Sequence, residues 1–291
     1  MRCYLLFLNF PCLILDYLYN SSMNDAIQSP FNYTGSKSNL IEQLNKYLPS
    51  DCSNGYDLFC GGGGFFVNSI DRFETIVAND IITPLMEFYS WMQKTEWNNV
   101  IKTLSDANIS KTDREAYAVL RSRFNQNKNF VDFFILVCSC TNNMMRFNKS
   151  LGFNQTWGKR HFNSNTENRL KAYHDRIYGN NKIRFENKSF KDVYIPDGSF
   201  VYIDPPYLIT EAGYNSYWSK SLEKELYDYL EEIDRRKIKF MFSNVMKHKG
   251  VENPYRDRLS RFRIIPLDFD YRKVARKQKN ENTEEIIAVN Y

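Results

Sequence analysis

Short apolar runs recur along the chain and are separated by stretches with helical spacing. Each run has the length of a strand and is rich in β-branched and aromatic residues. The four clearest runs are YDLFC at 56–60, TIVAN at 75–79, SFVYI at 199–203 and IKFMFSN at 238–244. Because strands that alternate with helices pair in parallel, this pattern predicts an α/β protein built on a parallel sheet.

The region between about residues 90 and 182 has a different pattern. Its longest apolar run, FVDFFILVCSC at 130–140, exceeds the usual length of a strand and indicates a buried helix. The segment at 152–169 is polar, aromatic and basic, which favours a hairpin or a loop surface over a core. The predicted division is a sheet unit of residues 23–90 and 182–291 and an inserted, mainly helical unit of residues 91–181 with a hairpin at about 141–160.

The first 22 residues form an apolar run that is interrupted by Asn9, Pro11 and Asp16. The run is shorter than the roughly 20 apolar residues that a membrane-spanning helix needs, and no A-x-A-like cleavage site follows it. Because a second methionine stands at Met23, we interpret residues 1–22 as an upstream extension or a disordered leader. The alternative is a weak membrane-surface or packing segment.

Composition narrows the class of protein. Apolar residues make up 43% of the chain and aromatic residues 16%, which is too much for a disordered chain and supplies flat side chains that can stack on bases. The net charge of +5 is a mild bias toward anionic partners. The six cysteines form no CxxC pair and there are only three histidines, so we expect neither a metal site nor a disulfide framework, and the reducing cytoplasm is the expected compartment.

A glycine-rich turn, Asp57-Leu-Phe-Cys-Gly-Gly-Gly-Gly64, follows the first predicted strand. Such a turn lets a ligand approach the backbone closely, although a turn without a ligand is the alternative. Asp80 ends the next strand, where an acidic residue hydrogen-bonds ribose hydroxyls in nucleotide-type sites. The Lys-Ser/Thr pair of a P-loop is missing, so the pattern favours a nucleotide-like cofactor over an NTPase.

A second motif, Asp204-Pro205-Pro206-Tyr207, directly follows the strand at 199–203. Proline fixes φ, so the loop can hold the Asp204 carboxylate and a neighbouring backbone carbonyl as two acceptors for one amine group. The aromatic ring of Tyr207 can stack on the planar base that carries this amine. The motif therefore indicates a site for an exocyclic amine, and a plain surface turn is the alternative.

Together these blocks resemble the Dam-type (alpha-group) DNA N6-adenine methyltransferases over about residues 30–291, with similarity to phage members. The family order is kept by Asn32-Tyr33-Thr34-Gly35-Ser36-Lys37, Asp57-Leu58-Phe59-x-Gly61-x-Gly63, Asn79-Asp80-Ile81, Asn143–Asn148, Phe153–Arg160, Phe190–Val193 and Asp204–Tyr207. The resemblance implies a Rossmann-like S-adenosylmethionine-dependent methyltransferase sheet, with residues 91–181 as the target-recognition domain. It also implies methyl transfer to the N6 amine of adenine.

The resemblance implies a set of cofactor-binding residues. Asp80 is expected to hold the ribose, and Ile81 and Phe190 to sandwich the adenine ring of S-adenosylmethionine. Any of the apolar members also suits an ordinary core. The full expected set is Tyr33, Lys37, Asp57, Phe59, Gly61, Gly63, Asp80, Ile81 and Phe190, with Asp204, Pro205, Pro206 and Tyr207 as the catalytic loop.

Chemistry on the adenine amine requires that the base leave the duplex. Asp204 and the Pro205 carbonyl then draw the amine toward tetrahedral geometry, and no covalent enzyme intermediate is needed. In phage Dam enzymes the residues that match Arg146 and Arg160 read the guanines of GATC, and an arginine fork suits guanine O6 and N7. Phosphate contacts are the alternative for both arginines. The expected DNA-binding set is Arg146, Asn148, Thr156, Lys159 and Arg160.

The hypothesis is a site-specific adenine methyltransferase that acts on double-stranded DNA as a monomer, with or without a partner restriction endonuclease and without a stable membrane partner. GATC or a related short palindrome is the expected target, although Thr141, Asn142 and Thr156 depart from the family pattern and leave the sequence open. Lys149 and the basic segment 272–279 are expected to contact phosphates or to remain solvated. The alternatives are a catalytically inactive DNA-binding protein that shields sites, and an RNA or protein amide methyltransferase.

Overall fold

A computed structural model describes residues 26–31, 37–148, 150, 152–210, 218–267 and 283–291. The N-terminal segment 1–22, Tyr33, Lys149 and the basic segment 272–279 lie outside the described residues. The helices are α2 (Ile41–Asn45), α3 (Gly64–Ser69), α4 (Thr83–Lys94), α5 (Trp97–Asp106), α6 (Arg114–Asn127), α7 (Phe130–Ser139), α8 (Ser164–Ile177) and α9 (Lys220–Arg235). The strands are β1 (Asn54–Asp57), β2 (Thr75–Asn79), β3 (Ile183–Glu186), β4 (Phe200–Ile203), β5 (Lys239–His248), β6 (Val251–Glu252), β7 (Arg263–Pro266) and β8 (Glu284–Val289).

These strands form one sheet in the order β3-β2-β1-β4-β5-β8-β7, with β6 paired to β5. The pairs from β3 to β5 are parallel, which confirms the predicted α/β sheet. The other edge of the sheet lies outside the four predicted runs, and there β8 pairs with β5 and with β7 in antiparallel fashion. The sheet is therefore mixed, and the chain returns through its C-terminal strands beside β5.

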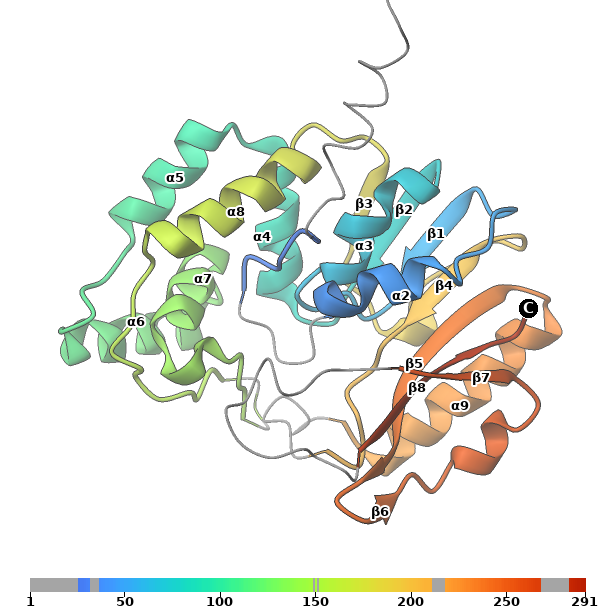
Figure 1. Cartoon of the computed structure of the whole chain (residues 1–291). Coiled ribbons are helices and arrows are strands. Elements are labelled where there is room, and N and C mark those ends of the chain that lie inside the picture. Colours follow the sequence, from blue (N-terminus) through green and yellow to red (C-terminus); the bar gives the residue numbers. More distant parts are fainter. Residues whose placement is uncertain (1–25, 32–36, 149, 151, 211–217, 268–282) are drawn as a thin grey trace, which may run out of the picture.

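Both faces of the sheet are covered, as the alternation along β4 shows. Phe200 and Tyr202 belong to the core on one face, together with residues of α2, α3 and the helices α4–α8. Val201 and Ile203 belong to the core on the other face, together with Leu226 and other residues of α9. All four β4 side chains are consequently buried. Figure 1 shows α5–α8 gathered beside the β3 edge and β7 and β8 at the opposite end.

The inserted region is helical, as its apolar run predicts. Asn129 caps α7 by accepting hydrogen bonds from the N–H groups of Val131 and Asp132, which satisfies donors that a helix start leaves unpaired. Phe134 of α7 stacks on Phe88 of α4 with ring centroids 4.6 Å apart. The predicted boundary at residue 90 thus falls inside α4, and the division into two units stays a prediction.

The segment at 152–169 is less of a surface than its composition suggests. Phe153 and Phe162 are buried, and residues 164–169 form the first turns of α8. The prediction of a loop surface over the whole segment is therefore wrong, because its aromatic side chains complete the core around α7. Among the described residues, no helix has the length and apolar composition of a bilayer-spanning segment.

Candidate functional site

A cavity of about 300 Å³ opens at the carboxyl ends of β1, β2 and β4. Parallel neighbours bring these three strand ends to the same sheet edge, which is where open α/β folds bind ligands. The residues of the sequence-predicted set that line the cavity are Lys37, Asp57, Phe59, Gly61, Asp80, Ile81, Phe190, Asp204, Pro205, Pro206 and Tyr207. The structure thus brings together the glycine-rich turn and the Asp-Pro-Pro-Tyr loop, although Asp57 and Asp204 are 147 positions apart in the sequence.

The glycine-rich turn connects β1 to α3 through two left-handed backbone positions. Gly61 has φ +45° and Gly63 has φ +73°, a region that residues with a side chain rarely adopt. A Cβ atom at Gly63 would lie 1.9 Å from the Tyr173 hydroxyl of α8. Gly63 is therefore needed for the approach of α8, and Gly61 is the one of the two that lines the cavity.

Asp80, which directly follows β2, stabilises this turn through hydrogen bonds to the backbone. Its Oδ2 accepts from the Gly61 N–H at 2.9 Å, and its Oδ1 accepts from the Ile82 N–H at 3.0 Å. Burial raises the pKa of the Asp80 carboxyl, and the backbone hydrogen bonds from Ile82 and Gly61 oppose this rise. A carboxylate oxygen has two lone pairs, so each oxygen of Asp80 can hold the turn and still accept a hydrogen bond from a ligand hydroxyl.

Asp57 at the end of β1 has a different environment. Its side chain is 1% exposed, and neither carboxylate oxygen has a partner at normal hydrogen-bond geometry in the described part of the chain, although the backbone N–H groups of Phe66 and Phe59 act to lower its pKa. Burial, reinforced by the nearby Asp204 carboxylate, raises the pKa of Asp57 well above its ordinary value. An unpartnered buried carboxylate is costly, and this one faces the cavity, where a cationic or N–H-bearing ligand would relieve the cost.

Aromatic side chains form one wall of the cavity. The rings of Phe59 and Phe190 lie 5.5 Å apart between centroids. Trp218 extends this wall and meets Phe59 edge-on at 5.7 Å. Ile81 lines the cavity with 54% of its surface exposed. Sequence reasoning missed Trp218, since it stands between the Asp-Pro-Pro-Tyr loop and α9 in no recognisable motif.

The Lys37 ammonium group forms an ion pair with the Asp204 carboxylate. Its Nζ is 3.0 Å from Oδ1 and 2.9 Å from Oδ2 of Asp204, and it donates to the Tyr207 hydroxyl at 2.7 Å. Burial raises the pKa of Asp204, and the Lys37 charge opposes this rise. Lys37 is expected among the cofactor-binding residues. It also balances the charge of Asp204, the residue expected to accept a hydrogen bond from the target amine.

A buried network continues behind this pair. The Tyr207 hydroxyl lies 2.8 Å from Asp204 Oδ1, 3.0 Å from Glu285 Oε1 and 3.1 Å from the Ser243 hydroxyl. Glu285 comes from β8 and also pairs with Lys37 at 3.3 Å. Sequence reasoning missed both Glu285 and Ser243. The antiparallel edge of the sheet thus supplies a second carboxylate to the site.

The expected DNA-reading residues lie on the segment after α7. Two antiparallel bridges, Cys140 to Trp157 and Phe147 to Phe153, fold this segment back on itself. Arg146 and Arg160 are both exposed, and Arg160 Nη1 donates to Asn143 Oδ1 at 2.9 Å.

The other polar residues of this segment support its turns. Asn148 Oδ1 accepts from the backbone N–H groups of Ser150 and Gly152 at 3.0 and 2.8 Å. The Thr156 hydroxyl is hydrogen-bonded to that of Thr141 at 2.9 Å. The side chain of Lys159 is exposed. Asn148 and Thr156 thus support turns of the segment. Arg146, Lys159 and Arg160 are exposed, with Arg160 bonded to Asn143 and the Lys159 ammonium 6.0 Å from the centre of the Trp157 ring.

Comparison with known proteins places this geometry in context. A family model described as D12 class N6 adenine-specific DNA methyltransferase matches residues 33–279. The chain is 28% identical to modification methylase StsI of Streptococcus sanguinis, over 93% of this chain and 44% of that protein. It is also 28% identical to type II methyltransferase M.FokI of Planomicrobium okeanokoites, over 92% and 43%.

A phage protein is also similar. The DNA N-6-adenine-methyltransferase of Escherichia phage P1 is 26% identical, over 86% of this chain and 33% of the phage protein. The chain thus spans less than half the length of these three curated relatives.

Proposed function

Because the chain belongs to the D12 class of N6 adenine-specific DNA methyltransferases, we propose that it transfers a methyl group from S-adenosylmethionine to the N6 amine of adenine in double-stranded DNA. The observation that carries the proposal is a single cavity lined both by the glycine-rich turn with its acidic strand ends and by the Asp-Pro-Pro-Tyr loop. A methyl donor and the amine that accepts the methyl group can therefore meet in this cavity.

The cavity suits S-adenosylmethionine. The unpartnered Asp57 carboxylate fits its ammonium group, and the second lone pairs of the Asp80 oxygens fit ribose hydroxyls. The ring of Phe190 offers a flat face and Ile81 an apolar surface to the purine ring, and Phe59 packs against the methionine end. When bound, S-adenosylmethionine supplies a methyl group activated by a positively charged sulfur.

Asp204 acts on the amine. The amine lone pair is delocalised into the purine ring, and an N–H donated to Asp204 Oδ and another to the Pro205 carbonyl favour tetrahedral geometry at nitrogen. Lys37 must then share or leave the carboxylate, and the Tyr207 hydroxyl and Glu285 give its Nζ two other partners within 3.3 Å. After transfer the amine carries one proton too many, and Asp204 is the base positioned to accept it.

The inserted region recognises DNA in this proposal. Arg146 and Arg160 contact guanine edges, because both are exposed on the folded-back segment and an arginine fork matches O6 and N7. Lys159 contacts phosphate. GATC or a related palindrome is the proposed target, read by a monomer in the cytoplasm. The names of the relatives, a modification methylase and a type II methyltransferase, support pairing with a restriction endonuclease.

The test is incorporation of methyl label from S-adenosylmethionine. The protein is incubated with duplex DNA, with RNA and with a protein mixture, and modified adenines are mapped by sequencing. Label confined to N6 of adenine in DNA at one short sequence is the expected result. DNA binding without label in any substrate would indicate a protein that only shields sites, and label in RNA or in protein amides would identify a different substrate class.

A further inference from the structure

The aromatic wall of the cavity includes one side chain that lies outside the sequence motifs. Trp218 lines the cavity beside Phe59 and Phe190, with ring centroids 5.7 and 6.3 Å away. Its indole N–H donates to Oε2 of Glu223, one turn into α9, at 2.5 Å. The indole plane is therefore fixed at one edge by a hydrogen bond while the ring lines the cavity.

Glu223 is an unusual residue for a buried position. Its side chain is 0% exposed, and no Lys or Arg of the described residues forms an ion pair with it. Its partners are neutral: the Trp218 indole and Asn244 Nδ2, which donates to Oε1 at 3.1 Å. Burial raises the pKa of Glu223, and the hydrogen bonds from these two groups and from Asn253 oppose the rise.

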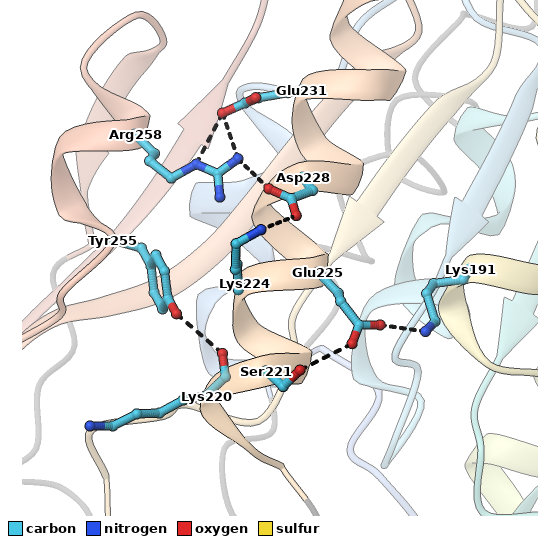
Figure 2. Close-up of polar contacts among 9 residues, drawn as sticks. All are labelled: Lys191, Lys220, Ser221, Lys224, Glu225, Asp228, Glu231, Tyr255 and Arg258. Atoms are coloured by element: carbon cyan, nitrogen blue, oxygen red, sulfur yellow. Dashed lines mark hydrogen bonds and ion pairs between the residues drawn. The ribbon is translucent and has the colours of Figure 1, made fainter.

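The outer face of the same helix shows the contrast. Figure 2 shows Glu225 paired with Lys191, Asp228 with Lys224, and Arg258 with both Asp228 and Glu231. Those carboxylates have cationic partners near solvent, where ion pairs contribute little. Glu223 instead bears the cost of burial to hold neutral donors, which an apolar residue of similar size would avoid.

We propose that Trp218 binds the planar ring of S-adenosylmethionine and that Glu223 is the positioning residue that holds its indole. This assignment rests on the proposed function of the cavity. A ring that rotates freely loses entropy when a ligand stacks on it, and a ring already held by Glu223 loses less. Asn244 connects Glu223 to the catalytic loop. It donates to Glu223 and directly follows Ser243 in β5, and Ser243 contacts the Tyr207 hydroxyl.

The orientation of Asn244 makes Glu223→Gln a specific perturbation. Asn244 Oδ1 accepts from the Val245 N–H at 2.7 Å, so its Nδ2 must point toward Glu223. The glutamine amide has one acceptor, and its NH₂ group would face either the Asn244 Nδ2 or the Trp218 indole N–H, both of which are donors. The substitution keeps the volume and removes either the hydrogen bond to Asn244 or the one to Trp218.

The experiment measures S-adenosylmethionine binding by calorimetry and by tryptophan fluorescence. We expect Trp218→Leu to raise Kd about ten-fold or more, as loss of a stacking partner does, and Glu223→Gln to raise it about three- to ten-fold. Binding should change the fluorescence of the wild type and of Trp91→Phe, because Trp91 packs on Phe88 outside the cavity. Trp218→Phe should lose most of that change.

Two comparisons isolate the positioning role. Glu231→Gln alters a carboxylate on the outer face of α9 and should leave Kd unchanged. If Glu223 acts through Trp218, adding Glu223→Gln to Trp218→Leu should raise Kd no further, whereas a general loss of packing would add in both backgrounds. Thermal melting of each variant identifies any that fails to fold. If Trp218→Leu does not fold, Trp218→Phe, which keeps an aromatic ring, tests the role of Trp218 through its fluorescence response.

The outcomes separate this assignment from the function beneath it. A wild-type protein that does not bind S-adenosylmethionine would overturn both. A wild type that binds, with Trp218→Leu and Glu223→Gln binding equally well and the fluorescence response intact in Trp218→Phe, would overturn the assignment alone.

Discussion

Replacing Asp204 with alanine should abolish methyl transfer and leave the cofactor cavity intact. The carboxylate is proposed to accept an amine N–H in the transition state, and loss of one such positioned group typically lowers kcat by 10²- to 10³-fold, or about 2.7–4 kcal/mol. Asp80, proposed to bind the cofactor, keeps its hydrogen bonds to Gly61 and Ile82, because neither involves Asp204. Loss of the Asp204 charge removes one cause of the raised pKa of Asp57 and so favours its ionised form. The Kd for S-adenosylmethionine should change less than three-fold.

The structure also bounds the cost of this substitution to folding. Removing one partner of a buried ion pair typically costs about 3–5 kcal/mol when the remaining charge has no other partner. Lys37 would keep Glu285 at 3.3 Å and the Tyr207 hydroxyl at 2.7 Å. The expected loss in the free energy of unfolding is therefore smaller, about 1–3 kcal/mol.

Three measurements on purified protein check the prediction: label transfer to duplex DNA under single-turnover conditions, calorimetry with S-adenosylmethionine, and thermal melting. Asp204→Asn is the companion variant, since it keeps the shape and replaces one acceptor oxygen with a donor. A folded Asp204→Ala variant that keeps more than about a tenth of the wild-type rate would refute the role of this carboxylate.

Three further variants and one control variant test the rest of the proposed site. Asp80→Ala should raise the Kd for S-adenosylmethionine about ten-fold and lower the melting temperature, since it leaves two buried N–H donors unpaired; unchanged affinity by calorimetry would remove Asp80 from the cofactor site. Lys37→Met removes the cation that opposes the raised pKa of Asp204, so this pKa should rise further. Activity needs the ionised carboxylate and should therefore be lost at a higher pH than in the wild type. If the acid limb of the kcat/KM profile does not move, the two residues are not coupled in this way. Arg160→Ala should weaken cognate duplex more than mismatched duplex, by about 1–3 kcal/mol if it reads guanine, and Lys159→Ala should weaken both alike; equal losses for Arg160→Ala would make it a phosphate contact.

Local sequence patterns predicted the parts of the site that a strand end and its turn contain. The run TIVAN predicts the strand at 75–79 with its observed bounds, because its apolar centre Ile-Val-Ala lies between polar residues. Asp80 and Asp204 could be placed at one sheet edge because both directly follow buried strands of parallel pairs. The helix at 130–140 was recognisable because its apolar run is too long for a strand.

Other residues of the site depend on pairings that the sequence does not display. Glu285 enters the network because β8 lies antiparallel to β5, and a short final run gives no sign of its strand neighbour. Trp218 reaches the cavity because Ser219 caps α9 and sets where that helix begins. The polar neighbours of Phe153 and Phe162 in the sequence indicate a surface, yet the two rings pack on α6 and α7 respectively.

The aromatic core that joins the inserted helices to the sheet limits how the proposed target specificity can be re-engineered. Phe134 of α7 stacks on Phe88 of α4 and also meets Phe31, which precedes the first helix. Exchange of the whole region 91–181 for that of another enzyme would leave these rings facing unmatched partners, and misfolded chimeras are the expected product. A transplant confined to the exposed side chains between the Cys140–Trp157 and Phe147–Phe153 bridges preserves the core. New sequence preferences should therefore be sought by varying a handful of loop positions and not by domain shuffling.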